Sequence, residues 1–366
     1  MFQTKYMKNA KFIVVILLSS FLFCAINVSA AQSIEPLDFI DLCKTGTLEE
    51  IEIAIRAGAD VNEKNNDEWT PLMQAARYSN TEVITTLIKA GADVHARDKS
   101  ERTPLMVASR WSSEPEAVTA LVQAGANVNA ERTNGWTALM DAVTRNRNLE
   151  FITALIEAGA DVNVKDELGY TPIIWTIRSD RNPDVINALI KAGADVNEKN
   201  NDGWTALMYA AFSRKNPEII TALVKAGADV NEKNDYERTP LMLAASFNDN
   251  PAVIIALIKA GADINAESKY GITALKCAVA GNHNPEKIKA LIKAGADVNE
   301  KNFVGWTPLM SAACFTDNPE AIIMLLQLGA DPKAKNRDGK MAIDYARTNE
   351  RLKNTDTLKM LEEVSR

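Results

Sequence analysis

The chain has 366 residues, of which 46% are hydrophobic and 24% are charged, and its formal net charge is −7. This composition excludes an intrinsically disordered chain, and the length exceeds what one ordinary globular core accommodates. The acidic balance also disfavours nucleic acid and anionic membranes as main partners, because binding to either requires a basic surface.

The beginning of the chain differs from the rest. Three lysines precede an apolar run from Phe12 to Ile26, and small residues follow up to Ala30. A positive start, an apolar run shorter than the roughly 20 residues of a membrane span, and small residues at its end are typical of a secretory signal peptide. We therefore expect a signal peptide at 1–30 that is cleaved after Ala30, a short linker at 31–34, and an exported protein.

Several alternatives for this segment stay open. The apolar run could be retained as a membrane anchor, translation could start at Met7 instead of Met1, and the exported chain could be periplasmic or secreted. Without residues 1–30 the chain has 38 basic and 48 acidic residues, which gives a net charge of −10. We expect this mature chain to be a monomer without a stable membrane span.

One phrase, Ala-Gly-Ala-Asp-Val-Asn in its commonest form, recurs along almost the whole remaining sequence. Its glycines are spaced by 33 residues at the first step and by 34 at each later one, at Gly58, Gly91, Gly125, Gly159, Gly193, Gly227, Gly261, Gly295 and Gly329. A fixed period of this size indicates stacked supersecondary units, each of which packs only on its neighbours. The chain therefore requires no single large core.

The unit from Asp202 to Asp235 shows the expected local structure. Thr205 is a natural N-cap for a short first helix, and in sister units a proline follows this threonine, at Pro71, Pro104, Pro172, Pro240 and Pro308. An Asn-Pro pair opens the second helix by the same logic, at Asn182-Pro183, Asn216-Pro217, Asn250-Pro251, Asn284-Pro285 and Asn318-Pro319. Gly227 then ends that helix, and the polar residues after it predict an extended turn.

These motifs resemble those of the ankyrin repeat family. The text that carries the resemblance is Thr-Pro-Leu at 70–72, 103–105, 239–241 and 307–309, followed each time by a helix and a Gly-Ala-Asp-Val-Asn-like turn. The resemblance implies an all-α ankyrin-repeat solenoid of helix-turn-helix units with short β-hairpin tips. It covers about ten units in an array at 35–366, with an N-terminal cap at 35–66, repeats at 67–337 and a C-terminal cap at 338–366.

One position departs from the family pattern. The signature histidine of the family is absent, and in most repeats methionine takes its place, at Met73, Met106, Met140, Met208, Met242 and Met310, with Ile174 and Lys276 elsewhere. We expect thioether packing there instead of the polar network that histidine provides in the family.

We expect no enzymatic activity, no cofactor and no metal site. The mature chain has only two histidines, His95 and His283, in units far apart, and it has no glycine-rich phosphate loop. Residues 195–200 resemble the start of a calcium-binding loop only faintly, because Lys199 stands where a calcium ligand is required. Cys43, Cys277 and Cys314 match no metal or redox spacing and are expected to be free thiols.

The resemblance implies that a protein partner of unknown identity binds on the concave face made by the hairpin tips and the exposed side of the first helices. Trp, Tyr and Arg are the residue types enriched in binding hot spots. The residues expected to bind the partner are Trp69, Arg102, Trp111, Trp136, Tyr170, Trp175, Trp204, Tyr209, Arg238 and Trp306. Further large residues stand at neighbouring positions, at Tyr78, Phe212, Tyr236, Phe247, Tyr270, Phe303 and Phe315.

Other interpretations of this face stay open. The tip aromatics could stack on one another as a purely structural ladder, in a chain that acts as a spacer of the cell envelope without a specific ligand. Carbohydrate and peptide ligands also suit aromatic surfaces. We favour a binding face because a tryptophan at a tip is expected to have no core to enter. The second helices carry charges such as Lys191 and Lys225, which indicate an ordinary solvated face.

Overall fold

The structure is a computed structural model that describes residues 38–78, 80–146, 148–179, 183–213, 217–281, 284–315 and 319–366. The predicted signal peptide and linker lie outside these residues. The chain divides into two compact units, which meet between Glu167 and Leu168 in the sequence. We call them the N-terminal unit and the C-terminal unit and describe each by itself.

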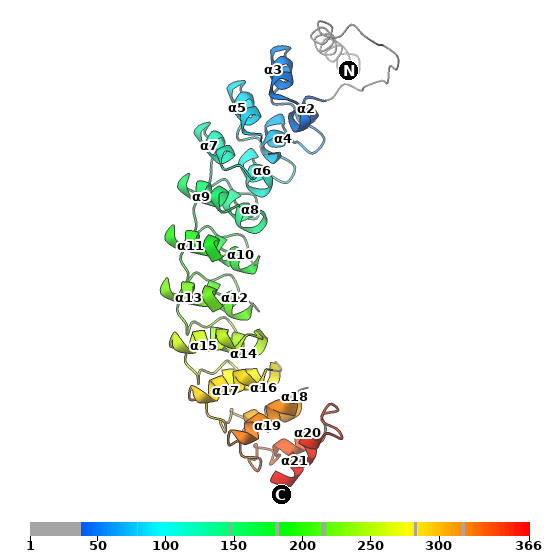
Figure 1. Cartoon of the computed structure of the whole chain (residues 1–366), viewed down its shortest axis with the longest axis vertical. Helices are drawn as coiled ribbons and strands as arrows, with labels where there is room; N and C mark the ends of the chain where they lie inside the picture. Colours follow the sequence, from blue (N-terminus) through cyan, green and yellow to red (C-terminus); the bar gives the residue numbers. More distant parts are fainter. Residues whose placement is uncertain are drawn as a thin grey trace. The chain divides into compact units, whose positions relative to one another are not determined.

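The N-terminal unit is built of helix pairs. Its helices are α2 (Phe39–Thr45), α3 (Leu48–Arg56), α4 (Pro71–Arg77), α5 (Thr81–Lys89), α6 (Pro104–Trp111), α7 (Glu116–Gln123), α8 (Ala138–Arg145) and α9 (Leu149–Glu157). The first helix of each pair packs on the first helix of the next, from α2 to α8, and the second helices form a parallel row from α3 to α9 (Figure 1). Two layers of helices result.

The C-terminal unit repeats this arrangement. Its first helices are α10 (Pro172–Arg178), α12 (Ala206–Phe212), α14 (Pro240–Phe247), α16 (Ala274–Gly281), α18 (Pro308–Phe315) and α20 (Ala342–Ala346). Its second helices are α11 (Pro183–Lys191), α13 (Pro217–Lys225), α15 (Pro251–Lys259), α17 (Pro285–Lys293), α19 (Pro319–Gln327) and α21 (Asp356–Val364). The predicted all-α solenoid of helix-turn-helix units is confirmed.

The predicted caps begin the helices. Thr205 Oγ1 accepts a hydrogen bond from the N–H of Met208 at 3.4 Å, and six sister threonines do the same, at Thr70, Thr103, Thr137, Thr239, Thr273 and Thr307. Thr171 makes no such bond. Asn250 and Asn284 cap second helices as predicted, whereas Asn182, Asn216 and Asn318 lie outside the described residues.

The core lies between the two helix layers and contains the predicted methionines. Each is 0–1% exposed, at Met73, Met106, Met140, Met208, Met242 and Met310, as are Leu207 and Ala211 beside them. Lys276 occupies the same position in its repeat and is 4% exposed. Its ammonium lies 3.3 Å from a carboxylate oxygen of Glu300, so this repeat keeps a buried polar contact where six others pack thioethers and one packs Ile174.

The recurring phrase ends each second helix and also joins neighbouring repeats. Gly227 has φ of +93°, and the N–H of Ala228 bonds to the carbonyl of Leu223 at 3.0 Å, which is a Schellman closure. Asn197 of the preceding phrase donates to the carbonyl of Gly227 at 2.9 Å and accepts from the N–H of Asp229 at 2.8 Å. The asparagine side chain therefore binds the backbone of the next copy.

The tips are tight turns closed by backbone hydrogen bonds. In one of them the N–H of Asn200 donates to the carbonyl of Trp204 at 3.0 Å, and Asn200 Oδ1 accepts from the N–H groups of Asp202 and Trp204. Within the described residues no strand is formed, and the isolated bridge between Glu131 and Thr137 is the only β-pairing. The tips thus have the hairpin path without a ladder.

Candidate binding face

The side of each unit that carries the tip residues and the outward positions of the first helices is called the first-helix face here. In the N-terminal unit its centre is a pair of tryptophan rings, Trp69 and Trp111, whose centroids lie 5.9 Å apart at 56°. Arg77 lies over both rings, at 5.5 and 5.2 Å, and so does Arg102, at 5.4 and 5.1 Å. We call these four side chains the Trp–Arg cluster.

A cavity of about 390 Å³ opens beside this cluster. The four cluster residues line it together with Asn65, Asp67, Gln74, Asp98, Lys99 and Ser100. Arg102 is held in place by Asp98, whose Oδ2 lies 2.8 Å from Nε and 2.7 Å from Nη2, and whose side chain is 1% exposed. Arg77 has only ring contacts within the described residues.

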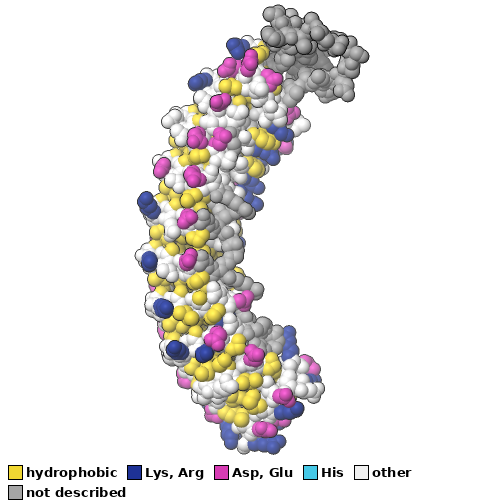
Figure 2. All heavy atoms as spheres, viewed as in Figure 1, with side chains coloured by type: hydrophobic (Ala, Val, Ile, Leu, Met, Phe, Trp, Pro, Cys, Tyr) yellow, Lys and Arg dark blue, Asp and Glu magenta, His cyan; other side chains and the backbone are white. Residues whose placement is uncertain are grey.

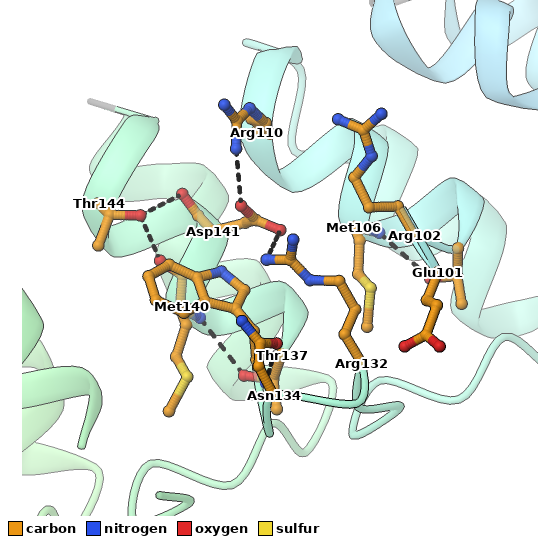
Figure 3. Close-up of polar contacts among 12 residues, drawn as sticks. Glu101, Arg102, Met106, Arg110, Arg132, Asn134, Thr137, Met140, Asp141 and Thr144 are labelled. Atoms are coloured by element: carbon orange, nitrogen blue, oxygen red, sulfur yellow. Dashed lines mark hydrogen bonds and ion pairs between the residues drawn. The ribbon is translucent and has the colours of Figure 1, made fainter. Parts of the chain in front are cut away.

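A buried carboxylate organises the next repeat (Figure 3). Asp141 in α8 is 0% exposed and lies between two guanidinium groups, with Oδ2 3.2 Å from Arg132 and Oδ1 3.5 Å from Arg110. Burial raises the pKa of the Asp141 carboxyl, and the charges of Arg132 and Arg110 and a hydrogen bond to Trp136 oppose that shift. Arg132 lies 5.4 Å from the ring of Trp136, so this tip tryptophan packs against the same ion pair.

The Arg132–Asp141 pair replaces a neutral pair found in other repeats. In two repeats of the C-terminal unit a tip asparagine donates to the hydroxyl of a tyrosine nine residues later, from Asn200 to Tyr209 at 3.1 Å and from Asn336 to Tyr345 at 2.8 Å. The spacing between Arg132 and Asp141 is the same. Most tips have Asn, Asp or Ser at the position of Arg132. In this repeat the tip has arginine instead, and Asp141 in α8 supplies the opposite charge.

In the C-terminal unit the rings form a continuous row across three repeats. Tyr170 contacts Trp175 at 5.1 Å and Tyr209 at 5.9 Å, and the hydroxyls of the two tyrosines are 3.2 Å apart. Trp204 continues the row to Tyr209 at 4.9 Å and to Phe212 at 5.8 Å, and Phe212 meets Phe247 at 4.9 Å. A separate group joins Trp306 to Phe315 and Tyr345.

The exposure of these rings differs from the sequence-based expectation. Trp69 and Tyr170 are each only 8% exposed, and the other five tryptophans are half-buried. The expectation that a tip tryptophan has no core to enter is therefore wrong for Trp69, because Trp111, Arg77 of α4 and Arg102 of the next tip cover it. Of the ten predicted residues, Arg238 is the one without a ring contact within the described chain.

The aromatic side chains that solvent reaches most are tyrosines and phenylalanines. On the first helices they are Tyr78, Phe212, Phe247 and Phe315, which are 40–58% exposed, and beside the tips they are Tyr236, Tyr270 and Phe303, which are 56–59% exposed. The list of ten did not include them. All seven stand at the neighbouring tip and first-helix positions already named from the sequence.

The second helices present charges and apolar side chains together. Lys191 and Lys225 are exposed as predicted. Two shallow depressions of about 510 and 460 Å³ lie between α11 and α13 and between α13 and α15, and Ile255 beside them is 41% exposed. Figure 2 shows hydrophobic atoms between the charged ones on this part of the C-terminal unit. The prediction of an ordinary solvated face is correct for the charges and omits this apolar component.

The described residues include three cysteines and one histidine. The three cysteines are free thiols as predicted, and Cys43 and Cys277 are buried. In the described part of the chain no three His, Cys, Asp or Glu side chains are placed to hold a metal ion. His95 is exposed, and His283 lies outside that part. No helix between residues 38 and 366, gaps excepted, has the length and apolar character needed to cross a bilayer.

A comparison with protein-family models gives a match. A family model described as ankyrin repeats (3 copies) matches the chain in overlapping registers, at residues 39–132, 87–166, 112–200, 139–234, 177–268, 207–302, 241–336 and 275–361. These matches span nearly all of the described residues. A search of curated proteins finds none that matches this chain.

Proposed function

Since the chain belongs to the ankyrin repeat family, whose members are generally protein–protein interaction modules and typically not enzymes, we propose that it binds a protein partner on its first-helix face. The observation that carries the proposal is the exposed end of the aromatic row in the C-terminal unit. Phe212 is 42% and Phe247 is 40% exposed, and their rings are in contact on adjacent repeats. Adjacent exposed aromatic rings are found on interaction surfaces more often than on surfaces that contact only solvent.

The rings and arginines of this face are already ordered before a partner arrives. Ring contacts of 4.9–5.9 Å hold the aromatic row, and two buried carboxylates, Asp98 and Asp141, fix three of the arginines. Binding to an ordered surface costs less side-chain entropy than binding to mobile side chains. The half-buried tryptophans then support the exposed rings and are not themselves the main contacts.

The proposal is tested with two matched variants of the exported chain. Phe212→Ser with Phe247→Ser removes exposed aromatic surface from the first-helix face, and Ile255→Ser removes a similarly exposed apolar side chain, 41%, from the second helices. Proteins captured by the wild-type chain and by Ile255→Ser are expected to be lost from the double Phe variant. Capture that survives the double change contradicts the assignment of the face.

A structural spacer without a specific ligand is the second candidate. The observation that favours it is the packing of the rings on one another, with Trp69 and Tyr170 at only 8% exposure. Iodide quenching of tryptophan fluorescence does not separate the two functions, because none of the six tryptophans is highly exposed. The capture experiment does separate them, since a spacer captures nothing that depends on Phe212 and Phe247.

The place of action is also part of the proposal. The lysines, apolar run and small residues before Ala30 support export through a cleaved signal peptide, to the periplasm or the cell exterior. We propose that the mature chain is monomeric and does not bind nucleic acid, which its net charge of −10 disfavours. N-terminal sequencing of the exported protein tests the cleavage, and a start at Met1 or Met7 contradicts it.

A further inference from the structure

The first-helix face of the N-terminal unit carries a group of basic side chains although the chain is acidic. Its basic residues include Lys44, Arg77, Lys99, Arg102, Arg110 and Arg132, and its carboxylates include Asp67, Glu68, Asp98, Glu101 and Asp141. Asp98 and Asp141 are buried and bind Arg102, Arg110 and Arg132. The positive charges that stay outside these pairs include those of Lys44, Arg77 and Lys99. Asp67 lines the cavity with Arg77 and Lys99, whereas Glu68 is paired with Lys64 at 3.3 Å.

Arg77 is the guanidinium of the Trp–Arg cluster that is open to a ligand. Its planar group lies 5.5 Å from the centroid of Trp69 and 5.2 Å from that of Trp111, which fixes its position without engaging its N–H groups. In the described residues it has neither an ion pair nor a hydrogen bond, in contrast to Arg102 beside it. An arginine held by rings presents its donors in the fork geometry that matches a carboxylate.

The cavity beside Arg77 also contains an unused acceptor and an apolar wall. Gln74 Oε1 is buried there without a hydrogen-bond partner, and such an oxygen is matched by an N–H group. The rings of Trp69 and Trp111 supply the apolar wall. The volume of about 390 Å³ is within the range of ordinary ligand pockets. Carboxylate, backbone N–H and apolar side chain occur together in an acidic stretch of polypeptide.

We propose that the Trp–Arg cluster binds an internal acidic segment of the partner protein, with an Asp or Glu carboxylate on Arg77, a backbone N–H on Gln74 and an adjacent apolar side chain against the tryptophans. An internal segment fits better than a chain terminus because Lys44, over the ring of Tyr78 at 5.6 Å, and Lys99 extend the unpaired charge beyond one site. This inference rests on the proposed protein-binding function of the first-helix face.

The experiment selects peptides from a random library of 12-residue segments displayed on phage without a free C-terminus, using the full mature chain as bait. The expected result is enrichment of Asp or Glu beside an aromatic or aliphatic residue. Synthetic, C-amidated copies of the selected peptides are expected to bind Arg77→Gln at least tenfold more weakly and Arg77→Lys with an intermediate loss. Their affinity is expected to fall as NaCl rises from 50 to 500 mM. Arg77 is exposed, so neither variant is expected to change the circular dichroism spectrum.

Three results overturn the inference. Selected peptides that are neutral or basic, peptides that bind Arg77→Gln as well as wild type, and peptides that bind only with a free C-terminal carboxylate each contradict it. If peptides lose binding to Phe212→Ser with Phe247→Ser but not to Arg77→Gln, the proposed function stands and only this inference fails. If no enriched peptide distinguishes any of these variants from wild type, both the inference and the proposed function fail.

Discussion

Replacing Asp141 by asparagine removes a charge from one of the most enclosed polar positions in the N-terminal unit. The side chain is 0% exposed, and its two oxygens face Arg132 at 3.2 Å and Arg110 at 3.5 Å. Removing one partner of a buried ion pair costs about 3–5 kcal/mol, because the other charge stays buried without compensation. Water reaches Arg132 and Arg110, whose side chains are 17% and 29% exposed, so we expect a loss somewhat below that range, about 2–3 kcal/mol.

Urea unfolding followed by circular dichroism measures this loss. The matched comparison is the double variant Arg132→Asn with Asp141→Tyr, which recreates the neutral pair that Asn200 and Tyr209 form in a sister repeat. We expect Arg132→Asn alone and Asp141→Tyr alone each to lower the free energy of unfolding. The double variant is expected to recover at least half of the larger of these two losses. Because the coupling energy also includes the whole of the smaller single loss, we expect it to be at least about 1–1.5 kcal/mol, which is typical of residues in contact.

Two results would contradict this account of Asp141. A loss below about 0.5 kcal/mol for Asp141→Asn refutes the view that a buried uncompensated arginine dominates the cost, since surface changes stay within that range. If the loss in the double variant equals the sum of the losses of Arg132→Asn and Asp141→Tyr, an Asn–Tyr pair does not replace the Arg–Asp pair at this spacing of nine residues.

Three further predictions concern other parts of the array. Burial lowers the pKa of Lys287 to about 8, so between about pH 8 and 10.5 the unfolded chain keeps a proton that the folded chain loses. As the pH rises through that window, the free energy of unfolding of wild type should therefore increase relative to that of Lys287→Met by up to about 3 kcal/mol. A difference between the two proteins that does not change with pH contradicts this. Asn197→Ala, which removes two hydrogen bonds between repeats, should cost about 1 kcal/mol in urea unfolding, whereas the cost of Asn265→Ala, whose side chain makes neither bond, should be near zero. Glu237 has φ of +55°, so Glu237→Gly should raise the melting temperature by relieving up to about 1 kcal/mol of backbone strain, and an unchanged or lower value contradicts this.

The period and the caps of the sequence were sufficient to predict the fold. Thr205 and its sisters cap first helices, and the methionines fill the core, because both depend on residues within one repeat or its immediate neighbour. The hairpin path of the tips was also predicted, but not the role of Asn200, whose side chain closes the turn in place of a ladder. Its recurrence as Asn, Asp or Ser in most repeats was the available signal.

The candidate face was less predictable because its packing joins residues of different repeats. Trp69 is covered by a ring that stands 42 positions later in the chain, so its own position at a tip gave no indication of burial. Arg132 and Asp141 each look like solvent-exposed charges when considered alone. A comparison with a sister repeat shows that both positions differ together, with Asn200 and Tyr209 in place of Arg132 and Asp141. The sequence alone does not indicate that these two positions are in contact.

The asparagine bridge between repeats has a consequence for how such a chain changes in evolution. Asn197 recognises only a carbonyl and an N–H of the next copy, which every amino acid other than proline supplies. Duplication or loss of a whole copy therefore leaves this joint intact whatever side chains the neighbour carries. Asp141 is different, because it requires Arg110 from the repeat before its own. The asparagine bridges of this array are thus indifferent to the order of the copies, whereas the ion pair between Asp141 and Arg110 depends on that order.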